Sequence, residues 1–313
     1  WVYQEEVYGR GDFQGHWWST GDLVAVLSLD EAPVREFTIV NHVPPGYLDK
    51  ERTVTTEVAN YPKAGDPNPF ASLQVVDAKN QRTVQVDLAA FPKDVIVVRV
   101  EWSPAGQLLV TLQDRIQTWA EFGSVDVATG KFTRWIREES KTWVNRPESP
   151  TWLADGTFLW RSERTGYQHV YRYKAGGELV NAVTSGDWQV RGIERVDETT
   201  QSIFFEASKD GAMGRHVYRG KLAGGDVVCI TPGTGVHQAE LSADGSAAID
   251  RWSAMDMPPV VQLVDTATGK VTKELGRAGT GDAEKYAFAA KVRLSIPTRD
   301  GDHLDGSLML PTD

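Results

Sequence analysis

Two kinds of turn that follow one another decide the fold, and both lie within residues 102–131, WSPAGQLLVTLQDRIQTWAEFGSVDVATGK. The first, residues 102–109, joins two apolar strand ends through a turn that contains Gly106. The second, residues 125–131, has an Asp-Val-Ala-Thr-Gly turn, in which glycine supplies the positive φ angle of a tight hairpin. Short runs rich in β-branched and apolar residues flank both turns, so each pair of turns predicts four strands.

Both turns recur along the chain. The first kind returns at residues 18–24, 152–159, 196–203 and 241–248, and the second at residues 76–82, 173–178, 222–226 and 264–270. The starts at 102, 152, 196 and 241 are 50, 44 and 45 residues apart. Four strands in a period of roughly 40–50 residues are typical of a β-propeller blade. We therefore predict an all-β chain with about five blades. The alternative is a β-sandwich whose hairpins look alike by chance, and the five paired copies of the two turns disfavour it.

The composition excludes several classes of function. The 313 residues hold 33 Lys and Arg against 43 Asp and Glu, a net charge of −10, which argues against nucleic acid or an anionic membrane surface as a partner. No apolar run reaches the roughly 18 residues of a membrane span. Cys229 is the one cysteine, which excludes an internal disulfide and a Cys-based zinc site.

Motifs of a complete active site are missing from the sequence. There is no Gly-x-Ser-x-Gly nucleophile elbow, no His-Glu-x-x-His and no Walker loop. The six histidines have no ligand-like spacing and are interpreted as surface or strand-pairing residues. We expect no metal and no cofactor.

The repeat pattern is interrupted in two places. Between residues 18 and 102 only one turn of the second kind occurs, which predicts one blade with an insertion at about 41–69 that is rich in proline and charge. From residue 286 the blade pattern stops, and one hairpin around Asp300-Gly301 follows. We therefore predict a partial β-propeller at 1–285 and the start of another domain at 286–313. Because Trp1 stands inside sequence that looks structured, we expect a processed product or an excised fragment with further blades before it.

Two adjacent carboxylates, Glu5 and Glu6, stand between aromatic residues in the opening WVYQEEVY. On a short helical turn or loop both could converge on one ammonium group, whose three N–H donors would meet four oxygens. Glutamate pairs are more often solvated surface residues, and residue types alone favour that interpretation.

The opening segment, together with Trp17-Trp18-Ser19, resembles the double-Glu segment of the dipeptidyl peptidase IV family. Further similar stretches follow in order at residues 61–69, 146–147, 155–158, 162–171 and 184–190, so the resemblance covers essentially the whole chain. It implies an eight-bladed propeller followed by an α/β-hydrolase domain with a Ser-Asp-His triad. It also implies a serine exopeptidase that releases N-terminal dipeptides, Xaa-Pro or Xaa-Ala, from peptides.

The resemblance also implies roles for particular residues. Glu5 and Glu6 would hold the free α-amino group of the substrate, and Arg146 would line the substrate cavity beside Asn145, where mammalian relatives carry an aromatic residue. The arm at 41–69 corresponds to a segment that relatives use in dimer contacts, so a homodimer is expected.

By the same resemblance, roughly three blades would precede Trp1. Residues 286–313 would be a linker and the start of a truncated α/β-hydrolase domain, with the catalytic triad downstream of Asp313. The chain alone should then be inactive.

The predicted function is thus substrate recognition in a dipeptidyl peptidase IV-like enzyme, with peptides that have a free N-terminus and the enzyme's own hydrolase domain as partners. A periplasmic or extracellular location is expected, because bacterial peptidases of this kind are often exported. One alternative is a non-catalytic propeller that binds peptides or proteins. Another is a related oligopeptidase or acylaminoacyl-type enzyme, which the Glu5-Glu6 pair disfavours because blocked N-termini need no ammonium anchor.

Overall fold

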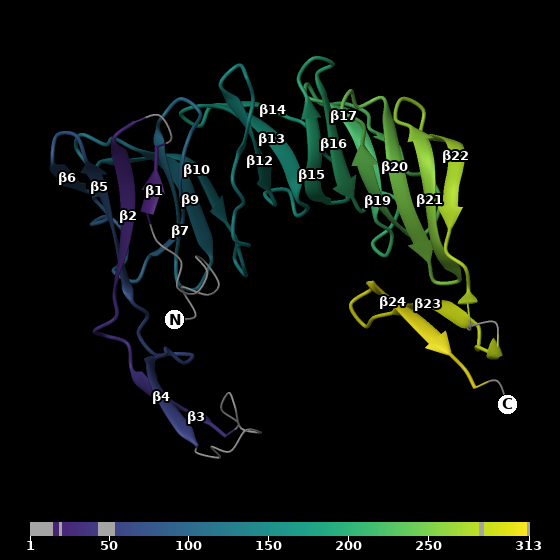
Figure 1. Cartoon of the computed structure of the whole chain (residues 1–313), viewed down its shortest axis with the longest axis horizontal. Coiled ribbons are helices and arrows are strands. Elements are labelled where there is room, and N and C mark those ends of the chain that lie inside the picture. The colour runs from purple at the N-terminus through teal and green to yellow at the C-terminus, as the bar shows by residue number, and fades with distance from the viewer. Residues whose placement is uncertain (1–14, 19–20, 43–53, 282–284, 312–313) are drawn as a thin grey trace. The chain divides into compact units, whose positions relative to one another are not determined.

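The computed structural model describes residues 15–18, 21–42, 54–281 and 285–311, and these residues form strands and turns (Figure 1). Twenty strands make five four-stranded antiparallel sheets, and four more make two separate hairpins. The described residues contain no α-helix, and hence none that could cross a membrane.

Each four-stranded sheet is built from strands that follow one another along the chain, apart from the excursion in the first sheet. The first has the order β1 (Gly15–Trp17), β2 (Leu23–Asp30), β5 (Phe70–Asp77) and β6 (Arg82–Gln85). The second contains β7 (Ile96–Trp102), β8 (Leu108–Gln113), β9 (Trp119–Val125) and β10 (Phe132–Glu139). The third contains β11 (Thr151–Trp152), β12 (Thr157–Ser162), β13 (His169–Lys174) and β14 (Leu179–Ala182). The fourth contains β15 (Val190–Asp197), β16 (Ser202–Ala207), β17 (His216–Lys221) and β18 (Val228–Cys229). The fifth contains β19 (Val236–Leu241), β20 (Ala247–Ala254), β21 (Met257–Asp265) and β22 (Lys270–Arg277).

These sheets confirm the predicted all-β class and the predicted blades of four strands. The first kind of turn joins the first and second strands of a sheet, as residues 103–107 do between β7 and β8. The second kind joins the third and fourth strands, as residues 126–131 do between β9 and β10. The number of blades in a complete propeller stays a prediction.

Burial along the strands follows from their place in the sheet. All six residues of β8, a central strand, are buried, which agrees with the four apolar residues in its sequence LLVTLQ. All eight residues of β22, an edge strand, are exposed, and its sequence KVTKELGR is correspondingly charged. A core cluster that joins the first two sheets includes Ala25, Leu73 and Leu108, each with no exposed surface.

Glycines in the turns between third and fourth strands let each sheet approach the one before it. A Cβ atom added to Gly130 would lie 2.0 Å from the carbonyl oxygen of Gln85 in β6, and one added to Gly177 would lie 2.2 Å from that of Trp135 in β10. Gly130 and Gly177 also have φ angles of +77° and +90°, which disfavour any residue with a side chain. The corresponding contacts further along the chain are Gly224 with the Ala182 carbonyl and Gly269 with the Cys229 carbonyl.

The two hairpins lie outside the five sheets. The first pairs β3 (Glu36–Asn41) with β4 (Thr55–Asn60), and the second pairs β23 (Lys291–Pro297) with β24 (His303–Met309). Because β2 pairs with β5 from Leu23↔Asp77 to Asp30↔Phe70, the whole of residues 31–69 leaves the sheet. The insertion therefore starts about ten residues earlier than the expected residue 41. The sequence of β3, EFTIVN, is typical of a strand, which is why the sequence alone places it in the blade.

The chain divides into two compact units. One consists of Trp1–Phe158 and Tyr173–Leu179, and the other of Leu159–Arg172 and Val180–Asp313. The candidate site described next lies wholly in the first unit.

Candidate functional site

Of the three substrate-binding residues predicted from the sequence, the structure describes one. Glu5 and Glu6 lie outside the described residues. Arg146 is described and exposed, in the loop that leads from β10 to β11. The structure therefore gives the surroundings of one predicted substrate-binding residue.

The backbone around Arg146 is fastened on both sides. Before it, the buried Val144 donates its N–H to the Gln117 carbonyl at 2.7 Å, and its carbonyl accepts from Gln113 Nε2 at 2.8 Å. After it, the carbonyl of the buried Pro147 accepts from an Arg99 guanidinium nitrogen at 3.3 Å. An exposed side chain is thus presented from a loop whose backbone is held in place.

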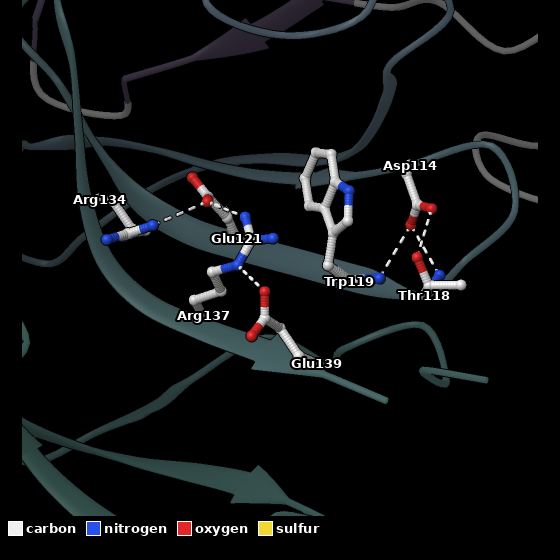
Figure 2. A network of polar contacts seen from close by, with 7 residues as sticks. All are labelled: Asp114, Thr118, Trp119, Glu121, Arg134, Arg137 and Glu139. Atoms are coloured by element: carbon white, nitrogen blue, oxygen red, sulfur yellow. Dashed lines mark hydrogen bonds and ion pairs between the residues drawn. The ribbon is translucent and has the colours of Figure 1, made fainter. Parts of the chain in front are cut away.

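The turn between β8 and β9 is the platform to which this loop is attached. Asp114 caps the turn, because its carboxylate accepts from the Thr118 N–H at 2.7 Å, the Thr118 hydroxyl at 2.8 Å and the Trp119 N–H at 2.9 Å (Figure 2). Gln117 in the same turn has a φ of 63°, the left-handed conformation that points its carbonyl toward Val144. Thr118 adds a further bond, since its carbonyl accepts from the Ser140 N–H at 2.9 Å just after β10.

Glu101 supports the loop further along. Burial raises the pKa of this half-buried carboxyl above its ordinary value, while a hydrogen bond from the Ser149 hydroxyl and the charge of Arg99 act in the opposite direction. Glu101 therefore links β7 to the end of the loop that carries Arg146.

A second polar network lies on β9 and β10, the two strands that precede the loop (Figure 2). The Glu121 side chain is 6% exposed, and its Oε1 accepts from Arg134 at 3.0 Å and from Arg137. Arg137 also pairs with Glu139 and lies over the Trp119 ring, 5.0 Å from its centroid. Burial opposes the charge of Arg137, but hydrogen bonds to Glu121 and Glu139 raise its pKa above the ordinary value.

The chemistry available at this loop is that of a guanidinium on a backbone that is held in place. A guanidinium stays charged at every physiological pH and offers planar N–H donors that suit a carboxylate or a peptide carbonyl. No group of three or more His, Cys, Asp and Glu side chains within the described ranges could hold a metal.

Three of the six histidines are buried and bonded inside the second unit rather than exposed. His169 pairs with the Gly186 carbonyl at 2.9 Å, and His216 with the Thr231 carbonyl at 2.8 Å. His237 donates to Asp250 at 2.8 Å, with both side chains at most 1% exposed. These histidines bond within their own sheets and the adjoining turns, as the strand-pairing interpretation expects.

A cavity of about 420 Å³ also lies in the second unit, lined by strands β15, β19 and β20. It brings together Glu194, Arg195, Glu240 and Arg251, so its charges balance. Arg195 is already engaged there with the carbonyls of Ser242 and Ala243. Neither this cavity nor the platform beneath Arg146 was predicted, because both arise from residues far apart in the sequence.

Comparisons with known proteins agree on one family. The family described as "Dipeptidyl peptidase IV (DPP IV) N-terminal region" matches residues 1–259. A probable dipeptidyl-aminopeptidase B from Talaromyces marneffei is 30% identical over 95% of this chain and 36% of its own length. A dipeptidyl peptidase 4 from Trichophyton equinum is 28% identical over 99% of this chain and 41% of its own length. The chain thus spans less than half of the length of these relatives.

Two solved structures that share the fold illustrate the structural likeness. The chain matches Porphyromonas gingivalis dipeptidyl peptidase 4 with a TM-score of 0.80 at 23% identity, over 99% of this chain and 43% of that one. It matches a putative dipeptidyl aminopeptidase IV from Bacteroides ovatus with a TM-score of 0.76 at 22% identity, over 95% of this chain and 44% of that one. At these identities the likeness concerns the fold.

Proposed function

Because the chain belongs to the dipeptidyl peptidase IV family through its N-terminal region, we propose that it is the substrate-recognition propeller of a serine exopeptidase that releases N-terminal dipeptides. The observation that carries the proposal is the family match over residues 1–259, which includes Glu5, Glu6 and Arg146. We assign the catalytic Ser, Asp and His to an α/β-hydrolase domain of a longer protein, in which residues 286–313 would form the first hairpin. The chain alone would then have no hydrolytic activity.

In this proposal Glu5 and Glu6 set the register of the substrate. A peptide's α-amino group, with an ordinary pKa of about 7.7–8.0, is largely protonated at neutral pH and would donate its N–H groups to both carboxylates. Once the ammonium is fixed, the bond after the second residue would lie at the catalytic serine. Positioning of this kind converts a general acyl-transfer reaction into release of dipeptides. The preference for Pro or Ala at the second position follows from the resemblance.

Arg146 would act as a second contact on the same peptide. Its side chain is exposed and its backbone is held from both sides, so the loop backbone would need no ordering before the guanidinium binds a peptide carbonyl. The contact would add affinity and orientation and would take no part in the proton transfers.

The test uses the full-length protein encoded by the complete reading frame. Glu5→Gln with Glu6→Gln should abolish cleavage of Gly-Pro and Ala-Pro anilides, while hydrolysis of p-nitrophenyl acetate, which has no ammonium group, should persist. Anilide cleavage that survives the double substitution would refute the anchor. A wild-type protein that binds such peptides and cleaves neither compound would favour a non-catalytic binding module instead.

We also propose that the segment at 41–69 contributes to a homodimer, and that the protein acts in the periplasm or outside the cell. The hairpin from which this segment extends supports the first proposal, because Phe37, Val40 and Val58 on its strands are 38%, 43% and 60% exposed. The second follows the exported bacterial peptidases that the chain resembles.

A further inference from the structure

We infer that Gln113 and Arg99 are positioning residues for Arg146: they hold the loop backbone on its two sides and so fix where the guanidinium meets the substrate. The inference rests on the proposed role of Arg146 in binding the peptide. Neither residue needs to touch the peptide, and neither was singled out by the sequence.

The first support is the burial of Gln113. This side chain is 1% exposed at the end of β8, and its Nε2 donates to the carbonyl of Val144 at 2.8 Å. A buried carbonyl without a donor is costly, so the loop cannot leave Gln113 without exposing Val144 or leaving its carbonyl unpaired. Val144 stands two residues before Arg146, which leaves the backbone at Arg146 little freedom to move.

The second support is the bond on the other side of Arg146. Arg99 comes from β7 and donates to the carbonyl of Pro147, the residue directly after Arg146. Proline adds rigidity here because its ring fixes φ and disfavours the helical conformation for Arg146. Two strands of one sheet, β7 and β8, thus fasten the four-residue stretch from Val144 to Pro147 at both of its ends.

The third support is the chemistry of the two bonds. Each is donated by a side chain to a backbone carbonyl, so each is independent of the identity of the exposed residue that the loop carries. A change at Gln113 or Arg99 would therefore alter the place of the guanidinium and not its charge. Misplacement of a binding group by about 1 Å can cost up to about a hundredfold in rate or affinity.

The experiment is a double-mutant cycle in the full-length protein, with KM and kcat measured on Gly-Pro and Ala-Pro anilides. Gln113→Leu keeps much of the buried volume and removes the donor, and Arg99→Lys removes the planar donor group at a partly buried place. We expect Arg146→Ala to raise KM about tenfold or more, and each positioning variant to raise it about threefold to tenfold, with kcat changed less than about twofold. In the Arg146→Ala background, Gln113→Leu and Arg99→Lys should have no further effect on KM.

Gln85→Leu is the control for loss of a glutamine bond to a backbone carbonyl elsewhere, because the exposed Gln85 donates through Nε2 to the carbonyl of Leu73 at 2.9 Å in the first sheet. It should leave KM unchanged. Thermal unfolding of each variant identifies any that does not fold, and if Gln113→Leu does not, Arg99→Lys carries the test alone.

The outcomes separate the two proposals. If Arg146→Ala raises KM but the positioning variants do not, or if their effects persist without Arg146, the positioning inference is refuted and the role of Arg146 stands. If Arg146→Ala leaves KM unchanged, the proposed role of Arg146 fails first, and the inference fails with it.

Discussion

The close approach of Gly177 to the preceding sheet leads to a sharp prediction, because its neighbour provides the control. Gly176 and Gly177 lie in the turn between β13 and β14, with φ angles of +98° and +90°. A Cβ at Gly176 would meet nothing within 4 Å, whereas a Cβ at Gly177 would lie 2.2 Å from the carbonyl oxygen of Trp135. Replacement by alanine therefore imposes a similar backbone strain at both places and a steric clash at only one.

The expected magnitudes follow from these two terms. The left-handed backbone costs an alanine about 1–2 kcal/mol at either position. At Gly177 the contact must also open by more than 1 Å to reach the ordinary separation of at least 3.4 Å, and the neighbour is a backbone atom that cannot rotate away. Overpacking of this kind costs about 1–3 kcal/mol more. Gly177→Ala should therefore destabilise the chain by about 2–5 kcal/mol, against about 1–2 kcal/mol for Gly176→Ala.

Equilibrium unfolding in urea, followed by tryptophan fluorescence, measures the difference as a lower midpoint at an unchanged m-value. Gly224→Ala and Gly225→Ala repeat the comparison one sheet further on, with a smaller expected gap because the Gly224 contact, to the Ala182 carbonyl, is 2.7 Å. Equal midpoints for Gly176→Ala and Gly177→Ala would show that the contact between sheets does not require glycine, and the argument from close approach would be refuted.

Three other predictions concern charge and assembly. Glu121→Gln should lower the free energy of unfolding by about 1–2 kcal/mol, less than for a fully buried pair because Arg134 and Arg137 are 54% and 32% exposed. Glu139→Gln, at a carboxylate 64% exposed, should cost under about 1 kcal/mol, and an equal loss in both variants would contradict this account. Burial raises the pKa of Glu101, so the folded state favours the protonated carboxyl. The stabilisation that this gives is fully present below the ordinary pKa of 4.5 and is lost as pH rises through the higher pKa of the folded state. Glu101→Gln should therefore gain stability relative to the wild type between pH 4 and pH 7 in urea unfolding, and a difference independent of pH would disprove the assignment. Deletion of residues 41–60 should convert a dimer of the full-length protein into a monomer by light scattering, whereas a mass that stays dimeric would exclude this segment as the contact.

The sheets could be predicted from the sequence because their signal is local and repeated. Each turn carries its glycine or aspartate within a few residues, and the flanking apolar runs show where strands begin and end. The 47-residue steps from Gly130 to Gly177 and on to Gly224 were also present in the sequence, and they could have shown that these glycines share one packing role.

The support beneath Arg146 could not be predicted in the same way. Gln113 and Val144 are 31 residues apart, and their bond joins a side chain to a backbone carbonyl, so no residue pattern marks it. Glu121 could not be predicted for a different reason. A charged residue in a strand is expected to face solvent, yet the Glu121 side chain is 6% exposed, with Arg134 and Arg137 as its partners. Arg146 itself was found by its resemblance to a family motif and not by its surroundings.

The pairing of β2 with β5 has a practical consequence. Asp30 and Phe70 lie opposite each other at the point where the hairpin-bearing excursion leaves the first sheet. The two ends of the excursion therefore meet across adjacent strands whatever lies between them, and lengthening a connection adds little entropic cost. The excursion also contacts the turn between β8 and β9, where Arg115 donates to the carbonyl of Asp66. A fluorescent reporter or an affinity handle should therefore be inserted within residues 31–69 and not replace them, so that this contact and the register from Leu23↔Asp77 to Asp30↔Phe70 stay intact.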